Sequence, residues 1–501
     1  MSLSLAYAIA NSAFAANATQ SSVVSQNVAN ANTPGYSREI ANVSATSYGG
    51  VDVSSVTRET NDALFDQVTS STSESAQAQA IADALSQLAE TVDDSASTTS
   101  ASGADQNGNS PSAMLGNLQT ALQTYETSPS DESAAQGVVT AASQLTGALN
   151  SGSAAVQNVR EQADADMASS VSTINSLLSQ YAAADAAVVS GLQSGANVGQ
   201  AEDARDSILT QLSQQIGVST ADNPNGSVSI YTDSGVTLYE GGVASTVTFE
   251  ATPTLTAGAS GNPVLVDGVA ITGPNAPMAI QSGALAGDAA VRDTIAPQYQ
   301  AQLDQIAGGL ISAFSESDQD NPPTQPTLPG LFTFPGATGV PTTSQMTGLA
   351  ASIEVNPNVD PSQGGDLDLL RDGGISDPGD AAYTYNTTGA AGFTGRIQQL
   401  ENNLTATQSF NPAAGLGASD SLMDYASASV GWLQGQNQQA SNQAEYQSAL
   451  LTQSTGALSN ADGVNLDTEL TNMLSLENSY TTTAKLLTTL QSMFTSLMDA
   501  A

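Results

Sequence analysis

The residues that most often carry catalysis are missing from this chain of 501 residues, which contains neither cysteine nor histidine. Disulfides, thiolate metal sites, thiol nucleophiles and imidazole bases are therefore excluded. Acidic pairs such as Asp366 and Asp368 could act as general acid and base, but 48 Asp and Glu residues make such pairs common by chance. A Ser-Lys arrangement would need Lys485, which lies in a helical heptad pattern. We expect no catalytic residue and no enzyme activity.

Motifs for cofactors and metals are equally weak. The run Asp-Gln-Asp-Asn at 318–321 is similar to the start of a calcium loop, but Pro323 stands where that loop needs glycine. Pro329 stands where it needs a bidentate glutamate. The glycine-rich motif that binds phosphate in nucleotide-binding proteins does not occur in the sequence. The sequence predicts no cofactor and no metal site.

The charge of the chain limits its partners. Eight Lys and Arg residues stand against 48 Asp and Glu residues, and the formal net charge is −40. Nucleic acid and membrane surfaces are not expected partners, because phosphate backbones and anionic headgroups attract clustered Lys and Arg. The first basic residue is Arg38, whereas a signal peptide needs a positive amino-terminal region. We expect a chain that is soluble or exported by a route other than Sec, without a cleaved signal peptide.

The clearest helical pattern lies at the carboxyl-terminal end. From residue 473 onward the spacing of three and four residues is unbroken, at Met473, Leu476, Tyr480, Thr483, Leu487, Leu490, Phe494 and Leu497. Further apolar residues widen this stripe, namely Leu470, Leu474, Leu486, Met493 and Met498. An ordinary core helix is an alternative interpretation. Because the stripe is long and terminal, we favour a seam that needs a partner helix.

The amino-terminal end offers that partner. Leu5, Ile9, Ala16 and Val23 share a heptad position, and Val28 lies near the end of the segment. The companion positions hold small or polar residues, which bury little apolar area at about 25 cal/mol per Å². We expect this helix to be marginal in isolation and to become ordered on assembly. The paired ends would form a coiled-coil axial domain of residues 1–50 and 456–501.

The hydrophobic period changes twice between the ends. Helices are predicted at about 62–90, 128–149, 156–192, 203–216, 293–314, 392–407 and 420–458. A period of two predicts a small antiparallel β domain over 217–290, with Asp267-Gly268 as a hairpin turn. The helical stem domain is then discontinuous, 51–216 and 291–455, with loops at 91–112 and 315–345. The expected fold is a mainly α, elongated multi-domain rod with an inserted β domain.

A turn motif follows the amino-terminal helix. Asn32 suits a helix end, Pro34 cannot continue the helix, Gly35 permits a positive φ and Tyr36 can act as an amphipathic anchor. These residues alone predict a helix-ending turn. The whole string at 28–38, Val-Ala-Asn-Ala-Asn-Thr-Pro-Gly-Tyr-Ser-Arg, resembles the signature of the axial proteins of the bacterial flagellum, which are rod, hook and hook-associated proteins.

Two further stretches extend this resemblance. The string Gly-Val-Asn-Leu-Asp-Thr-Glu-Leu at 463–470 resembles the matching carboxyl-terminal element of the axial proteins. The segment from Arg205 to Val218, followed by the β segment at 226–230, is similar to the family of the first hook-associated protein, FlgK. The helical patterns at 114–149 and 300–304 also fit that family.

The resemblance implies a structural subunit at the junction between hook and filament. It implies export through the flagellar type III channel, an extracellular place in the flagellum, and assembly as a ring of about eleven copies. The other implied partners are hook protein, the second junction protein, and an export chaperone on the carboxyl-terminal helix. The residues expected at the assembly interface are Leu5, Ile9, Val23, Val28, Asn32, Pro34, Gly35, Tyr36, Leu466, Leu470, Met473, Leu476, Tyr480, Leu487, Leu490, Phe494 and Leu497.

Two alternatives stay open at this point. One is another axial protein, either hook protein or the second junction protein, which would share the two terminal elements. The other comes from a different class, a secreted acidic adhesin or hydrolase that uses the β domain.

Overall fold

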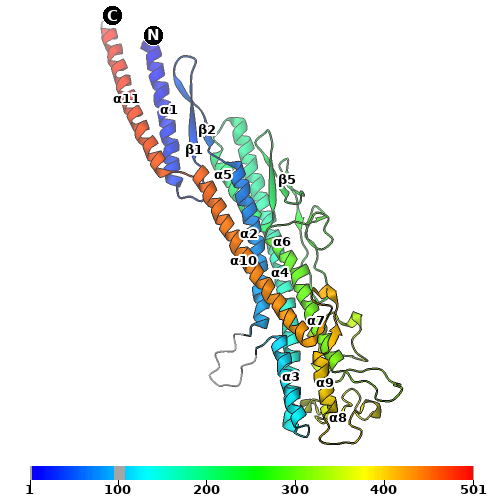
Figure 1. Ribbon diagram of the computed structural model, residues 1–501. Helices are drawn as coiled ribbons and strands as arrows, with labels where there is room; N and C mark the ends of the chain where they lie inside the picture. Colours follow the sequence, from blue (N-terminus) through cyan, green and yellow to red (C-terminus); the bar gives the residue numbers. More distant parts are fainter. Residues whose placement is uncertain (1–2, 95–107, 500–501) are drawn as a thin grey trace.

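One helix, α4 (Glu132–Ser194), runs through the centre of the protein for 63 residues, or about 95 Å at 1.5 Å per residue. The computed structural model describes residues 3–94 and 108–499, which form a long rod (Figure 1). The predicted break between residues 149 and 156 is wrong, because α4 is continuous there. Contacts with distant segments stabilise the helix between residues 149 and 156. Asn150 Nδ2 donates to the carbonyl of Ala350, and Ser153 Oγ donates to Gln300 Oε1.

The other stem helices pack against α4 or against one another. They are α2 (Asp62–Ala89), α3 (Pro111–Thr127), α7 (Ala296–Ala313), α9 (Gly395–Thr405) and α10 (Leu422–Asp462). Their shared core contains Leu85, Leu118, Leu145, Leu303, Leu310 and Tyr425. Most of the loop predicted at 91–112 lies outside the described residues. The described part shows that α3 already begins at Pro111, where Ser110 Oγ accepts from the backbone N–H of Ala113.

The strands between residues 218 and 270, which we call the β segment, form two small antiparallel sheets beside α4. They follow α5 (Gly199–Gln215) in the chain. The first sheet has the order β3-β4-β5-β6 and consists of β3 (Val218–Asp222), β4 (Val228–Thr232), β5 (Thr237–Glu240) and β6 (Val243–Ala244). The second consists of β7 (Val247–Thr248), β8 (Leu265–Val266) and β9 (Val269–Ala270). Both sheets contribute to a second core, with Met167, Ile174, Tyr181, Leu209, Ile230, Leu238 and Val266.

The predicted hairpin turn is confirmed. Asp267 and Gly268 have φ values of 46° and 86° and connect β8 to β9, as the Asp-Gly pair predicted. The strands do not fill the whole predicted segment, because residues 284–290 form a helix, α6 (Ala284–Ala290). A single π-helical turn, Val291–Ile295, joins α6 to α7.

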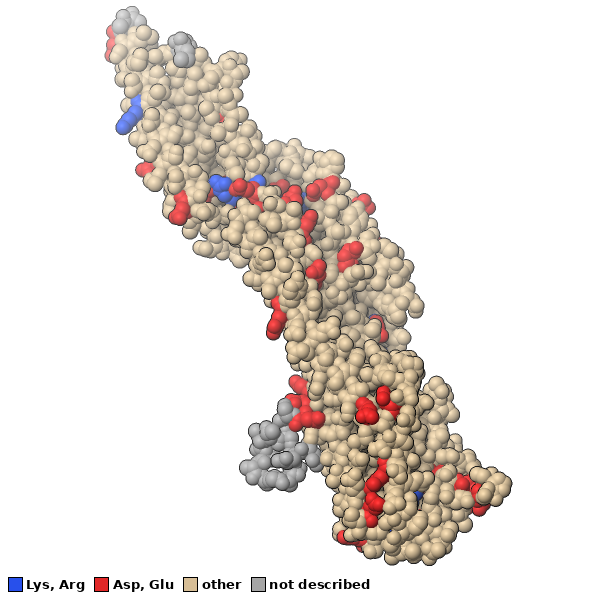
Figure 2. Space-filling model, in the orientation of Figure 1, with Lys and Arg blue, Asp and Glu red and all other residues tan. Residues whose placement is uncertain are grey.

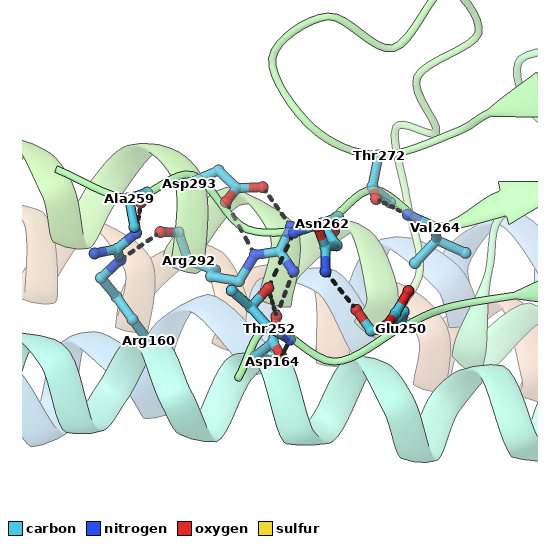
Figure 3. A network of polar contacts seen from close by, with 10 residues as sticks. All are labelled: Arg160, Asp164, Glu250, Thr252, Ala259, Asn262, Val264, Thr272, Arg292 and Asp293. Atoms are coloured by element: carbon cyan, nitrogen blue, oxygen red, sulfur yellow. Dashed lines mark hydrogen bonds and ion pairs between the residues drawn. The ribbon is translucent and has the colours of Figure 1, made fainter. Parts of the chain in front are cut away.

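A buried arginine network fastens the β segment to the stem (Figure 3). Arg292 lies where α6 continues into α7, and its NH1 is 2.6 Å from Asp164 Oδ1 on α4. The other oxygen of Asp164 accepts from the backbone N–H of Thr252 at 2.7 Å. Arg160, one turn earlier on α4, donates to the carbonyls of Thr256 and Ala259. These charged groups therefore hold three separate segments together inside the protein.

The end of the stem that lies away from the termini is irregular (Figure 1). It contains α8 (Leu369–Asp372) and two short strand pairs, β10 (Phe332–Thr333) with β11 (Glu354–Val355) and β12 (Thr407–Ser409) with β13 (Ser419–Ser421). The segment predicted as a loop at 315–345 includes β10 and an isolated bridge between Glu316 and Leu328.

The two ends of the chain lie together at the opposite end of the rod (Figure 1). There α1 (Leu3–Asn30) packs against α11 (Leu466–Asp499), which confirms the predicted pairing of terminal helices. A hairpin of β1 (Glu39–Ala45) and β2 (Val51–Arg58) contacts α1 and was not predicted. The predicted boundary at residue 50 falls within this hairpin, and the division into domains stays a prediction. Within the described ranges, no helix combines the length and apolarity that a bilayer span requires.

Candidate functional site

The terminal pair, α1 with α11, is antiparallel and has a defined register. Asn17 Nδ2 donates to Ser479 Oγ at 2.9 Å, and the rings of Phe14 and Tyr480 lie 4.5 Å apart between centroids. Nearer the stem, Asn27 Nδ2 lies 3.3 Å from Glu469 Oε2. Residue numbers that increase along α1 are thus paired with residue numbers that decrease along α11, as in an antiparallel pair. Because α1 supplies mainly small residues at this contact, the two helices approach closely but bury little apolar area.

The predicted interface residues of α1 face inward to different degrees. Val23 is buried, whereas Leu5, Ile9 and Val28 are half-buried. On α11, four predicted residues are also half-buried: Met473, Leu476, Leu487 and Leu490. The other five are exposed: Leu466, Leu470, Tyr480, Phe494 and Leu497. The structure therefore covers only part of the predicted stripe within one chain.

The uncovered part of α11 is a long apolar surface, which we call the α11 face. It consists of Leu466, Leu470, Leu474, Tyr480, Leu486, Met493, Phe494, Leu497 and Met498. Leu474 is 62% exposed and Leu497 is 63% exposed, values that are unusual for leucines spaced along a helix. Exposed apolar residues in this number are uncommon on one surface of a monomeric soluble protein.

The predicted turn lies at the base of the terminal pair. Asn32, Pro34 and Gly35 are exposed, and Gly35 has the expected positive φ of 77°. Tyr36 is half-buried, and its hydroxyl donates to Asn27 Oδ1 at 2.8 Å. Burial, together with the nearby carboxylates of Glu39, Asp203 and Glu469, raises the pKa of Tyr36 to about 12. The turn therefore folds back onto α1 through its tyrosine.

Arg38 connects the two terminal segments just after this turn. Its Nε donates to Glu469 Oε1 at 2.7 Å, and its NH1 donates to Glu59 Oε2 at 2.8 Å. The hydrogen bond to Glu469 is the main reason why the pKa of Arg38 is raised above its usual value. The backbone N–H of Arg38 also donates to the carbonyl of Asp462 at the end of α10. We call Arg38, Glu469 and Asn27 the Arg38 clamp.

A second arginine fixes the hairpin to the stem. Arg58, at the end of β2, forms ion pairs with Glu202, Asp203 and Asp206 of α5 at 2.7–2.9 Å. Burial alone would lower the pKa of Arg58, but Asp206, Asp203 and Glu202 raise it above the ordinary value. The hairpin therefore lies between the terminal pair and the stem and is bound to both.

A cleft of about 840 Å³ lies at the same junction, between the turn, α2, α5 and the end of α10. Its walls include Pro34, Phe65, Leu209 and Leu458. Two buried side-chain atoms, Arg205 Nε and Asp462 Oδ1, have no hydrogen-bond partner among the described residues. Burial raises the pKa of Asp462. The cleft separates the terminal pair from the stem and has no catalytic constellation among its described lining residues.

The positive charges of the chain lie mainly inside it. All eight Lys and Arg residues fall in the described ranges; five arginines are buried, Arg38 and Arg58 are half-buried, and Lys485 is exposed. Figure 2 shows basic and acidic side chains together where the terminal pair meets the stem, whereas most other charged atoms on that face are acidic. Five of the seven arginines are thus internal, and the charged groups at the surface are mainly acidic.

The sequence predicted the helices and the turn but missed the residues that join them. Arg38, Glu469 and Asp206 all lie in the strings that carried the family resemblance, yet no role was assigned to them. The scarcity of arginine was the available signal. With so few positive charges among so many carboxylates, each arginine beside a turn or strand end was a candidate ion-pair partner.

Two family models match the chain. The one described as the helical domain of flagellar hook-associated protein FlgK matches residues 104–321. The one described as the carboxyl-terminal part of flagellar basal body rod proteins FlgEFG matches residues 455–500. The second match covers the whole of α11, and the first covers α3, α4, α5 and the strands of the β segment.

The chain is also similar to individual proteins. The chain is 24% identical over 516 residues to "Flagellar hook-associated protein 1" of Bacillus subtilis, and the match covers 96% of this chain and 94% of that one. A solved structure, the flagellar hook junction protein FlgK from Burkholderia pseudomallei, is 23% identical with a TM-score of 0.40. That match covers 54% of this chain and 46% of the Burkholderia chain.

Proposed function

The chain belongs to the FlgK family of flagellar hook-associated proteins, and from this premise we propose that it forms the junction between hook and filament as one of a ring of identical subunits. The family is a structural one, and a structural role at this junction follows from membership. The ring, the route of export and the individual contacts are proposals. The observation that supports them best is the α11 face, which remains uncovered in one chain.

The α11 face fits a lateral contact between copies. Its leucines, methionines and aromatic residues remain largely exposed on a helix that packs on α1 with only part of its surface. A neighbouring terminal pair that covers this face would remove apolar area from water, at about 25 cal/mol per Å². A head-to-tail contact of this kind closes into a ring when the rotation between copies is a simple fraction of a turn. By analogy with the family we propose a ring of about eleven copies.

The remaining partners follow from the proposed position. Hook protein would lie on one side of the ring and the second junction protein on the other. Each would contact the terminal pairs of the ring through terminal helices of its own. Before assembly, an export chaperone on α11 would cover the same apolar face during passage to the type III channel. Outside the cell the chain would be part of the flagellum.

Flagella of a deletion strain provide the test. We expect electron microscopy to show hooks without filaments, and the wild-type gene to restore filaments. A variant with Leu474→Asp and Met493→Asp, both on the α11 face, should fold but fail to restore them. Val243→Asp is the matched control, because Val243 is 71% exposed but lies in the β segment. Normal filaments in the deletion strain, or full rescue by the α11 variant, would contradict the proposal.

A further inference from the structure

A groove of about 400 Å³ runs between α2, α4 and α6, far along the chain from the terminal pair. Its floor and rim carry three carboxylates, Asp83 from α2, Asp166 from α4 and Asp288 from α6. The described residues that line it include no Lys or Arg. Small side chains, among them Ala80, Ala84 and Ala163, complete the lining and keep the groove open.

Asp288 is the unusual residue of the groove. It is only 8% exposed, and the structure shows no hydrogen bond or ion pair to its carboxylate within residues 3–94 and 108–499. A buried carboxylate without a partner is costly unless it is protonated or neutralised. The other buried carboxylates near this region are paired, as Asp164 is with Arg292. Asp288 is therefore exceptional within the stem.

Close packing of α6 holds Asp288 in this position. A Cβ atom on the preceding residue, Gly287, would lie 2.8 Å from the backbone oxygen of Gln77 on α2. Glycine therefore lets α6 approach α2 at this point, while α6 also contacts α4. Asp288 is thus kept at the bottom of the groove by backbone packing.

The exposed rim carboxylates are already oriented. Gln79 Nε2 donates to Asp83 Oδ1 at 2.7 Å, and Gln162 Nε2 donates to both oxygens of Asp166 at 2.9 and 3.0 Å. Each pair spans one turn of its own helix, so Asp83 and Asp166 line the groove from two different helices. A ligand in the groove would meet carboxylates from three helices.

We propose that this groove binds one hydrated divalent cation, with Mg²⁺ as the best fit, between the carboxylates of Asp288 and Asp166. Among the described residues no three acidic side chains converge closely enough to hold a bare ion. Mg²⁺ suits this arrangement, because it commonly keeps several waters and is held by one or two carboxylates. Six waters occupy about 180 Å³ at about 30 Å³ each, which the groove accommodates.

The cation would strengthen the stem at its three-helix crossing. It would neutralise Asp288, join α4 to α6, and leave Asp83 and Gln87 of α2 as partners for its outer waters. Binding to the folded chain alone stabilises it by mass action, so the melting temperature should rise with the concentration of Mg²⁺.

The test is calorimetric titration of the purified chain with MgCl₂ and, separately, CaCl₂, in about 150 mM NaCl to screen diffuse attraction. The titration is done at pH 8, since burial and Asp166 raise the pKa of Asp288 to about 7. We expect one saturable Mg²⁺ site and a parallel rise in melting temperature. Asp288→Asn should weaken binding at least tenfold, and Asp166→Asn should weaken it as well.

Two controls make the outcome decisive. Glu161→Gln removes an exposed carboxylate of α4 that does not line the groove, and it should leave binding unchanged. Asp166 is exposed, so Asp166→Asn gives a readout even where Asp288→Asn alters folding. The proposal is overturned by many weak sites without saturation, by equal binding in Asp166→Asn and wild type, or by a site that takes Ca²⁺ but not Mg²⁺.

Discussion

The Nε of Arg38 donates to Glu469 Oε1 at 2.7 Å, which joins two residues that are 431 positions apart in the chain. Glu469 is only 1% exposed, so the pair is largely removed from water on the carboxylate side. The same carboxylate accepts from Asn27 of α1. One glutamate of α11 thus connects the amino-terminal helix, the hairpin and the carboxyl-terminal helix, and the Arg38 clamp couples the terminal pair to the stem.

Removing this carboxylate should free the terminal pair. Glu469→Ala leaves Asn27 and Arg38 without their buried acceptor, and breaking a buried pair costs about 3–5 kcal/mol. Local opening should become at least about a hundredfold more frequent, because each 1.4 kcal/mol is a factor of ten. Trypsin provides the measurement, since cleavage after Arg38 requires opening of the clamp.

The matched control acts on the same arginine. Glu59 also pairs with Arg38, but its side chain is 45% exposed, so Glu59→Ala should cost less than about 1 kcal/mol. Cleavage after the buried Arg160 should be the same in both variants and in wild type. Equal cleavage rates after Arg38 in Glu469→Ala and Glu59→Ala would show that the clamp does not control opening.

The terminal pair should be less protected than the stem in the free chain. Its contact is built from small residues of α1, and its ordering cost is about 1–2 kcal/mol per residue. We therefore expect amides of α1 and α11 to exchange with solvent much faster than core amides of α4, and to become protected in assembled flagella. Mass spectrometry of peptides from 3–30, 466–499 and 135–178 measures this directly. Strong protection of both ends in the monomer would argue against ordering on assembly.

The elements of this fold were predictable where the signal is local. The Asp267-Gly268 turn and the terminal pair follow from residue type and spacing within a few turns of chain. The continuity of α4 does not, because Asn150 and Ser153 favour an interruption until distant segments bond to their side chains. At these two residues, tertiary contacts outweigh a low intrinsic preference for helix.

The candidate site divides in the same way. The apolar stripe on α11 predicted which residues of that helix are available for contacts, since the helical period alone places them on neighbouring faces. It could not tell which of them α1 covers, as Leu487 is half-buried while Leu474 is exposed. The Arg38 clamp and the Arg58 ion pairs join residues far apart in sequence, and no local pattern specifies such pairs.

Stability should depend on pH through Tyr36. Its pKa is about 12 in the folded chain and about 10 when unfolded, so the unfolded chain loses this proton first as pH rises. The stability that the protonated hydroxyl contributes is complete below pH 10 and is lost as pH rises towards 12. Tyr36→Phe removes this dependence, together with about 1 kcal/mol from the bond to Asn27.

Comparing the two chains isolates this residue. Denaturation midpoints of wild type and Tyr36→Phe are measured at pH 8, 10 and 11, and the difference in stability between the two chains is compared at each pH. The other buried tyrosines are the same in both chains, so their ionisation does not affect this difference. Wild type should be the more stable chain at pH 8, and its advantage should shrink at pH 11. A constant difference across this range would mean that Tyr36 is not protected from ionisation.

The buried network of Figure 3 should be the most sensitive point of the stem. Asp164→Ala removes the partner of Arg292, which is fully buried, and the acceptor of the Thr252 N–H. We expect a loss of about 3–5 kcal/mol in the free energy of unfolding, since an uncompensated charge remains inside. Asp164→Asn should cost less, because it keeps an acceptor for Thr252. Glu161→Ala, on an exposed position of the same helix, should change stability by no more than about 0.5 kcal/mol. Urea unfolding measures all three, and equal losses for Asp164→Ala and Glu161→Ala would mean that Asp293 alone is sufficient to neutralise Arg292.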